Sequence, residues 1–273
     1  MTLPSFRKPP VTEVVAGVTF KRLEGLTTPL IIDAWRALFI EDLPTVQEQP
    51  QYLPPAETFE FPDVPSRLSI AVELPTATAP RFWFSSRDQQ ELVQVQGNWF
   101  ACNWRKVGPN AEYGRWHTIH NAFERQFAKF SAFCSERGVG SIEVEQSEVT
   151  YVNHIEPGSA WDSLSEMHRV VRLIGVQDRS LMPVDPEQTT MRVSYRIVSD
   201  RIKAGKLHVS VDPGLRMQDM RPLIAMTLTG RAVPLSPRAG DSLSSMDVAR
   251  DWIVRCFAAI TTDAAHEQWE RYE

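Results

Sequence analysis

Cysteine is scarce in this sequence. Among 273 residues there are three cysteines, Cys102, Cys134 and Cys256, far apart and each inside a predicted helix or strand. An odd, dispersed set is typical of reduced thiols in a cytoplasmic protein and argues against a disulfide framework. The sequence also has no C-x-x-C and no H-x-x-x-H pair, so we expect no zinc site.

Long apolar runs are missing as well. No stretch approaches the roughly 20 apolar residues that a membrane-spanning helix needs. The first ten residues, MTLPSFRKPP, hold a basic cluster with no apolar region after it, which is not the pattern of a signal peptide. We therefore expect a cytoplasmic protein with no membrane partner.

The common catalytic templates are also absent. The sequence has no G-x-S-x-G elbow, no G-x-x-x-x-G-K-[ST] loop and no G-x-G-x-x-G after a strand. These absences exclude the usual serine hydrolase and nucleotide-binding signatures. We expect no cofactor, and an enzyme is the less favoured class of function.

An excess of basic charge is lacking too. The formal net charge is −5 and the isoelectric point about 5.8, whereas proteins that neutralise phosphates usually carry a basic field. Nucleic acid is therefore a disfavoured partner. Hydrophobic residues make up 42% of the chain, which is enough for a substantial core in one large domain or two modest ones.

Two similar segments of the sequence indicate how the chain is organised. TEVVAGVTF, from Thr12, and SEVTYVNHI, from Ser147, are β-branched runs that both begin with a hydroxyl residue, Glu and Val. Each is followed by a short predicted helix, several strands and a long helix. We predict an α+β protein of two tandem β-α-β-β-β(-β)-α units, residues 1–140 and 141–273, with antiparallel sheets packed as one body and each backed by a long amphipathic helix.

Periodicity and capping residues place the elements. Short helices are predicted after Thr28 and after Ser159, and long helices on two apolar stripes, one from Trp116 to Cys134 that ends at Gly138 and one from Ala249 to Ile260. The predicted strands are RLSIAVE, RFWFSS, LVQVQ and WFACNWR in the first half, and MRVSYRIV, KLHVSV and LIAMTLTG in the second.

Proline gathers in one segment. Residues 44–65 contain six prolines, so this stretch cannot be a central strand or a helix. The main interpretation is an extended connection that wraps over the sheet. A polyproline segment that binds a partner and a mobile loop are the alternatives.

Several stretches together resemble an uncharacterised, sporadically distributed prokaryotic protein family. They span nearly the whole chain: PPVTEVV, VQEQP, RFWFSS with LVQVQGNWFACNWRK, EVTYVNHI, and IVRCFAAITTDAAHEQWER. The resemblance implies a soluble bacterial protein but brings no known activity and no known catalytic residues. The patchy distribution of such a family suggests genes that travel with mobile elements or defence loci.

The run VTYVNHI supplies the first candidate site residues. Alternation along a strand puts Tyr151 and Asn153 on one face with apolar residues, and His154 on the other. Tyr151 and Asn153 are binding candidates with buried hydrogen bonds. His154 is a weak catalytic candidate, for which a structural role is the alternative.

A second set of candidates lies in WFACNWRK. Cys102 is a weak catalytic candidate because Arg105 and Lys106 supply positive charge and His154 could approach from the other half; a buried structural thiol is the alternative. Trp99, Trp104 and Arg105 are binding candidates, because the two tryptophans have opposite parity on the strand and we expect at least one to be exposed.

Two histidines of the first long helix, His117 and His120, are three residues apart. No third ligand lies nearby in sequence, so we interpret His120 as a core histidine and expect no metal.

The chain ends in AITTDAAHEQWERYE, where H-E-x-x-E resembles part of a metalloprotease helix. Position 270 is glutamate where a zinc site needs histidine, which argues against a metalloprotease. Thr262 is predicted to cap a short last helix, with Ala265, Trp269 and Tyr272 on its apolar face. His266, paired with Glu270, and Trp269 are expected to dock the tail, while His266 stays a weak catalytic candidate.

Three function classes follow. The favoured one is a non-catalytic binding or accessory protein that acts through a protein partner. The second is an enzyme with a site at the junction of the two halves, where a small molecule could bind. The third is a nucleic-acid binder, since the predicted element order is also that of the saddle-shaped TATA-binding fold, an analogy of topology alone.

Overall fold

The computed structural model describes residues 2–55, 57, 59, 80–108, 111–175, 178, 180–217 and 219–273. In chain order its elements are β1 (Val11–Phe20), α1 (Thr28–Leu38), β2 (Thr45–Gln49), β3 (Arg81–Ser85), β4 (Glu91–Gln96), β5 (Trp99–Arg105), α2 (Arg115–Glu136), β6 (Val144–Ile155), the 3-10 helix η1 (Leu164–Arg169), β7 (Met191–Ile197), β8 (Ile202–Leu215), β9 (Pro222–Pro234), α3 (Ala239–Ile260) and α4 (Asp263–Gln268).

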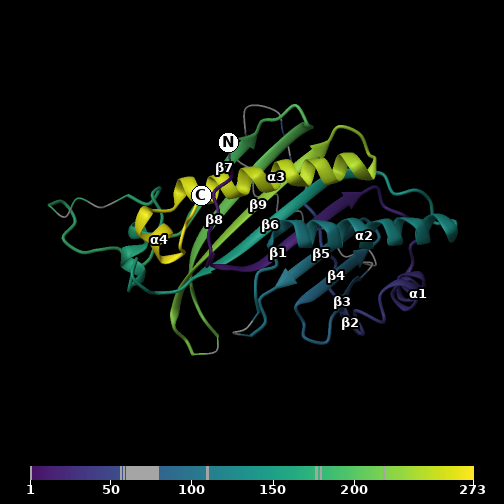
Figure 1. Ribbon diagram of the computed structural model, residues 1–273, viewed down its shortest axis with the longest axis horizontal. Coiled ribbons are helices and arrows are strands. Elements are labelled where there is room, and N and C mark those ends of the chain that lie inside the picture. The colour runs from purple at the N-terminus through teal and green to yellow at the C-terminus, as the bar shows by residue number, and fades with distance from the viewer. Residues whose placement is uncertain are drawn as a thin grey trace.

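All nine of these strands join one antiparallel sheet, in the order β2-β3-β4-β5-β1-β6-β9-β8-β7 (Figure 1). The predicted α+β class is confirmed. The two halves of the chain meet in the middle of the sheet, where β1 pairs with β6 and Val14 lies opposite Tyr151. Both halves run strand, helical segment, strands and long helix; that this order reflects an internal duplication stays a prediction.

Helices α2 and α3 cover one face of the sheet (Figure 1). The two predicted stripes point inward: residues from Trp116 to Cys134 of α2 and from Ala249 to Ile260 of α3 are buried at helical spacing. Phe100 of β5 stacks on Phe130, with ring centroids 5.1 Å apart. Helix α2 ends before Gly138, whose φ of 70° is the left-handed conformation that stops a helix.

Small residues bring α3 close to the sheet. A Cβ at Gly230 of β9 would lie only 3.0 Å from the Cβ of Ala249, so a side chain at this position would have to push α3 away from the sheet by a few tenths of an ångström. Nearby, the Ser245 hydroxyl donates to the Ser147 hydroxyl of β6 at 2.8 Å. The second half of the chain is thereby fixed to its helix by close backbone packing.

Two of the predicted helix starts are wrong. Thr27, not Thr28, is the residue before α1, and it makes no side-chain capping bond. After Ser159 the chain forms only the 3-10 helix η1, preceded by Ser163. The Ala160 amide donates to the Gln268 side chain at 3.1 Å, so this segment is held against the C-terminal tail.

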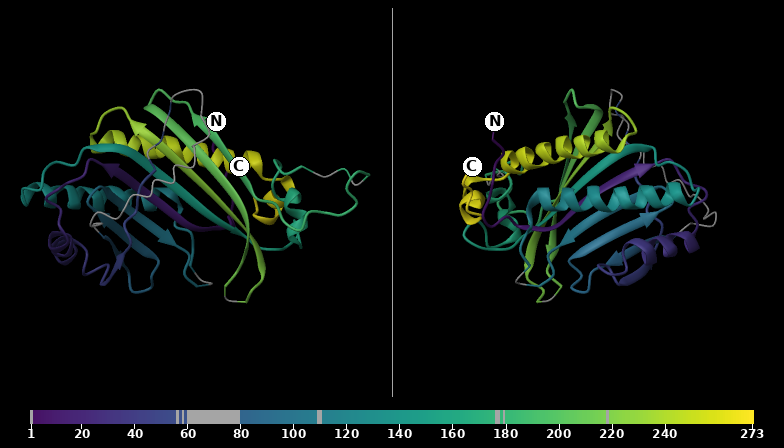
Figure 2. Two further views of the ribbon diagram at one scale, coloured as in Figure 1. Left: turned by 180° about the vertical axis from the view of Figure 1, so that it is seen from behind. Right: turned by 45° about the vertical axis from the view of Figure 1, so that its right-hand side comes forward.

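We call the side of the sheet opposite α2 and α3 the far face. The left view of Figure 2 looks onto this side. The described part of the proline-rich segment, residues 50–55, 57 and 59, contacts this face through Tyr52, Pro55 and Glu57. Tyr52 exchanges two hydrogen bonds with the Gln96 side chain, at 2.8 and 2.9 Å, and its ring packs on Trp99. The predicted extended connection is confirmed for these residues, and β2 lies at the edge of the sheet. The predicted strand RLSIAVE lies outside the described residues.

Candidate functional site

A cavity of about 230 Å³ lies at the junction of the two halves. Its lining comes from the N-terminal segment, the start of α2, strands β6 and β9, and α3. The lining residues are Pro4, Ser5, Phe6, Pro9, Val11, Tyr113, Arg115, Trp116, Tyr151, Asn153, Leu228, Arg250, Ile253, Val254, Phe257 and Tyr272. For comparison, an engineered apolar cavity of about 150 Å³ takes up benzene. This cavity, called here the junction cavity, is therefore large enough for a small organic molecule.

Two predicted binding residues, Tyr151 and Asn153, line the junction cavity. Both are buried, as strand alternation predicts. The Tyr151 hydroxyl lies 2.9 Å from the Tyr113 hydroxyl, and the Asn153 amide donates to the Met226 carbonyl at 3.1 Å. Burial raises the pKa of both tyrosines, so both are protonated at neutral pH. They can donate hydrogen bonds but cannot serve as bases.

The tyrosine pair leaves one donor free. Each phenol has one hydrogen, and only one of the two can lie between the oxygens. The hydroxyl that accepts this bond keeps its own hydrogen for a third group. The cavity wall thus presents an unused O–H donor.

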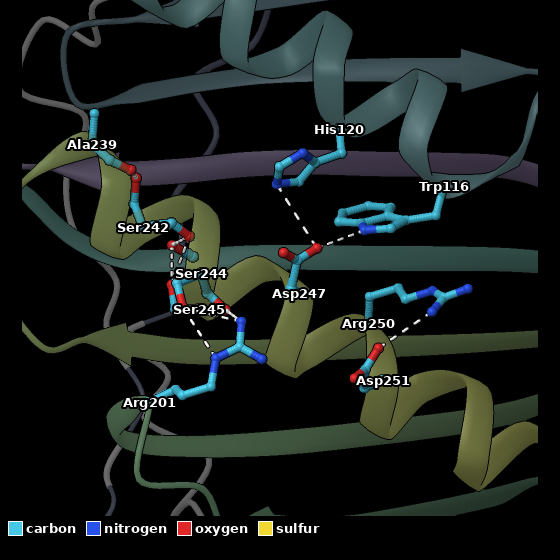
Figure 3. Close-up of polar contacts among 11 residues, drawn as sticks. Trp116, His120, Arg201, Ala239, Ser242, Ser244, Ser245, Asp247, Arg250 and Asp251 are labelled. Carbon is cyan, nitrogen blue, oxygen red and sulfur yellow. Dashed lines mark hydrogen bonds and ion pairs between the residues drawn. The ribbon is translucent and has the colours of Figure 1, made fainter. Parts of the chain in front are cut away.

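Two arginines add positive charge. Arg250 of α3 contacts Asp251 through Nη1 at 3.2 Å, while its buried Nε–H has no partner among the described residues (Figure 3). Arg115 donates to the Phe6 carbonyl at 2.9 Å. Its φ of 67° is rare for a residue with a side chain, and such strain costs of order 1–3 kcal/mol and often marks functional sites. No lining residue is acidic.

Asp247 links the two long helices beside the cavity. Its Oδ1 accepts a hydrogen bond of 2.8 Å from the Trp116 indole and lies 3.8 Å from His120 Nε2 (Figure 3). The side chain of His120 is 16% exposed at this contact between the helices, as the core interpretation predicts, but its Nε2 has no hydrogen-bond partner among the described residues.

Both chain ends close one side of the cavity. The main chain of Phe6 bridges that of Arg271, and the Tyr272 amide donates to the Ser5 carbonyl at 3.0 Å. Phe6 packs edge-on against Phe257 and Trp269. Phe6, Phe257 and Tyr272 also line the cavity, so docking of the tail and the shape of the cavity depend on each other.

His266 lies inside this contact between the chain ends. Its Nε2 is 2.8 Å from the Thr261 hydroxyl, whose hydrogen already goes to the Phe257 carbonyl, so Nε2–H is the donor. Nδ1 then accepts from Arg271 at 3.2 Å. Burial and Arg271 lower the pKa of His266, which is therefore neutral. The prediction that His266 pairs with Glu270 is wrong, because the Glu270 carboxylate forms an ion pair with Lys8 of the N-terminal segment.

The rest of the tail prediction is mixed. Thr262 caps α4 through its hydroxyl, which accepts from the Ala265 amide, and Ala265 and Trp269 are buried as predicted. Tyr272 is 52% exposed and does not share that buried face, because the chain leaves α4 before it.

The three weak catalytic candidates do not meet. Cys102 pairs with Ala16 and faces the helices, whereas His154 is exposed on the far face, so the sheet separates them. Burial strongly raises the pKa of the Cys102 thiol, which keeps it protonated. Cys102 does line a second, 60 Å³ cavity with Gln126. His266 lies in the tail, and none of the three lines the junction cavity.

The three candidates on β5 lie on both faces. Trp99 is 2% exposed, under Tyr52 on the far face. Trp104 is half-buried on the helix face and packs against Tyr113, so it supports the junction cavity from outside. Arg105, also half-buried, lies over the Trp83 ring at 5.9 Å. The expectation of an exposed tryptophan at Trp99 or Trp104 is wrong, because each is covered by a tyrosine.

A second polar cluster ties the proline-rich segment to the far face. Arg231 donates to Glu57 at 2.7 Å and to Glu148 at 2.6 Å. Glu57 also accepts from His208, whose other nitrogen accepts from the exposed Ser194 hydroxyl at 2.9 Å. The order Ser–His–Glu resembles a hydrolytic triad, but Arg231 occupies the same Glu57 oxygen and neither described cavity contains Ser194. The cluster acts as a tether.

Sequence reasoning missed Tyr113, Arg115 and Arg250. A signal for Arg250 was present, since Arg250, Ile253 and Phe257 follow helical spacing and an arginine within an apolar stripe is unusual. Within the described part of the chain, no group of three His, Cys, Asp or Glu side chains is arranged to hold a metal. No helix there has both the length and the hydropathy needed to cross a bilayer.

Comparison with known proteins adds no assignment. No protein-family model and no curated protein matches the chain. A solved structure, the di-domain ARO/CYC StfQ from the steffimycin biosynthetic pathway, matches 91% of this chain and 99% of that chain with 8% identity and a TM-score of 0.16. A TM-score this low supports no inference about fold or function.

Proposed function

We propose that this chain is a non-catalytic binding protein whose ligand is a small molecule held in the junction cavity. The observation that carries the proposal is the cavity itself: 230 Å³ of space at the meeting point of both halves and both chain ends, with polar donors beside apolar side chains in its wall. Concave, largely apolar sites with a few convergent polar groups are the usual form of ligand pockets.

A binding role fits the chemistry of the lining better than a catalytic one. The lining offers three phenols, an amide and two guanidinium groups, all of which can donate hydrogen bonds. Histidine, cysteine and carboxylates, the usual bases and nucleophiles, are missing from it. The enzyme at the junction of the halves stays an alternative prediction.

Ligand binding should stabilise the folded chain, because only the folded chain has the cavity. The test fills the cavity with a side chain. Val254 lines it, and the next residue, Arg255, is exposed on the same helix. Val254→Trp should abolish binding of small aromatic probes such as indole and phenol, whereas Arg255→Trp should not.

The measurement is a thermal shift titration, together with native mass spectrometry of the protein as purified from cells. A bound small molecule should be present in the wild type and in Arg255→Trp and missing from Val254→Trp. If both variants bind the probes like the wild type, the cavity is not the ligand site and the proposal is wrong.

A protein partner is the second candidate. Apolar side chains are exposed near the β8–β9 turn, with Leu215, Met217 and Met220 at 50%, 87% and 60% exposure. Exposed apolar clusters often mark protein contacts. Met217→Ser with Met220→Ser should abolish retention of any partner that the wild-type chain captures reproducibly. Nucleic acid remains the third alternative, and a mobility shift at low salt tests it.

A further inference from the structure

The charge of the junction cavity is one-sided. Arg115 and Arg250 line it, and no acidic residue does. Two carboxylates of α3 lie outside the lining: Asp247 accepts from the Trp116 indole, and Asp251 pairs with Arg250 at 3.2 Å and balances part of its charge. A group that enters the cavity therefore meets two guanidinium groups and no carboxylate of the lining.

The cavity also has hydrogen-bond donors that lack acceptors. The buried Nε–H of Arg250 has no partner in the described parts of the chain. The Tyr113–Tyr151 pair keeps one hydroxyl hydrogen unused. A buried donor without an acceptor lowers the stability of the protein, because it has lost its hydrogen bond to water. A ligand with acceptor oxygens would restore that hydrogen bond and bind more tightly for this reason.

The rest of the wall includes several apolar side chains. Phe6, Val11, Leu228, Ile253 and Phe257 are buried side chains of the lining. They can exclude water from a hydrocarbon or aromatic body, and the volume of 230 Å³ exceeds the roughly 150 Å³ that holds benzene. The space suits one ring with a short acidic side chain.

We infer that the ligand of the junction cavity is a small organic carboxylate, with an aromatic or short aliphatic body, whose head group binds Arg250 and the Tyr113–Tyr151 pair. This inference rests on the proposed function. A planar guanidinium matches the two oxygens of a carboxylate, and hydrogen bonds between charged partners are among the strongest. The apolar wall leaves little room for a hydrated dianion such as inorganic phosphate.

The test compares matched probes on the full chain by isothermal titration calorimetry. The carboxylates are benzoate, phenylacetate and 3-phenylpropionate, and each is paired with its neutral amide. Phenylphosphonate and inorganic phosphate test the choice of anion. At least one carboxylate should bind at least ten times more tightly than its amide and than either phosphorus compound.

Variants then locate the head group. Arg250→Gln should weaken carboxylate binding about ten- to hundredfold, the range expected for a lost charge-assisted hydrogen bond, and Tyr151→Phe about threefold to tenfold. Arg255→Gln, on the exposed side of the same helix, should leave it unchanged. If Arg250→Gln fails to fold, Arg250→Lys replaces it and should show a smaller loss, because lysine keeps the charge but not the fork.

The outcomes separate the two proposals. Equal binding of carboxylates and amides, tighter binding of phenylphosphonate, or binding unaffected by the Arg250 variants would overturn the carboxylate inference. The cavity would still be a ligand site if Val254→Trp abolished that binding. If no carboxylate binds, the inference is wrong; if indole and phenol also fail to bind, the proposed function fails with it.

Discussion

Removal of the Trp269 side chain should destabilise the whole molecule, although this residue is only four positions before Glu273. Its indole is 3% exposed. It lies 5.1 Å from the Phe257 ring of α3 and 6.1 Å from the Phe6 ring, measured between centroids. Its carbonyl accepts from the Lys8 amide at 3.1 Å. Trp269 thus joins the last helix, α3 and the N-terminal segment.

The magnitude follows from this burial. Truncation of a buried tryptophan to alanine costs about 3–5 kcal/mol, the sum of lost burial and the cavity left behind. The cost cannot exceed the free energy that docks the tail, because a tail that detaches exposes no further surface. We expect Trp269→Ala to lower the free energy of unfolding by about 3–5 kcal/mol, with the Phe6 contact contributing roughly 0.5–1.5 kcal/mol of it.

Chemical denaturation followed by circular dichroism measures this loss. Tyr272→Ala is the matched control: it lies in the same tail, is 52% exposed and should cost less than about 1 kcal/mol. A double-mutant cycle with Phe6→Leu isolates the aromatic contact. If the denaturation midpoint of Trp269→Ala equals that of the wild type, the docking of the tail by this ring is refuted.

Three further predictions concern stability. Because burial lowers the pKa of His266, the unfolded chain takes up a proton at this site before the folded chain does as pH falls. The free energy of unfolding should therefore decrease below about pH 6.5. In denaturation series between pH 7.5 and 5.5, His266→Gln should show a smaller decrease. Gly230→Val should lower the melting temperature strongly, since its side chain would collide with Ala249 of α3, and Gly230→Ala should do so less. Arg231→Met removes the ion pair of the buried Glu148 and one of the two partners of Glu57, and should cost about 3–5 kcal/mol, a loss that denaturation at pH 7 would show and that Glu148→Gln in the same chain should partly restore.

The tail shows how far local sequence reasoning reaches. The cap at Thr262 and the burial of Trp269 depend on spacing within one helical turn, and both predictions are confirmed. The partner of His266 was wrong, because Glu270 was already paired with Lys8 across the contact between the two chain ends. Spacing inside the tail carries no information about a segment more than 250 positions away.

The junction cavity shows the same limit at a site. Tyr151 and Asn153 were predicted as buried polar residues because strand alternation puts them among apolar neighbours. Tyr113 and Arg250 were not, since they come from a loop and from another helix, and only the fold brings them to Tyr151. Likewise the sequence allows His154 to approach Cys102, but the two residues lie on opposite faces of the sheet.

The fold class, several strands and the inward faces of α2 and α3 could be predicted from the amino-acid sequence alone. These features follow from periods of 2 and 3.6 residues, which any short window of the chain displays. The tertiary structure alone decided that β1 and β6 join the halves into one sheet, that the two chain ends close against each other, and that a cationic cavity lies between them. Such contacts depend on where the chain returns in space, and no local pattern records that.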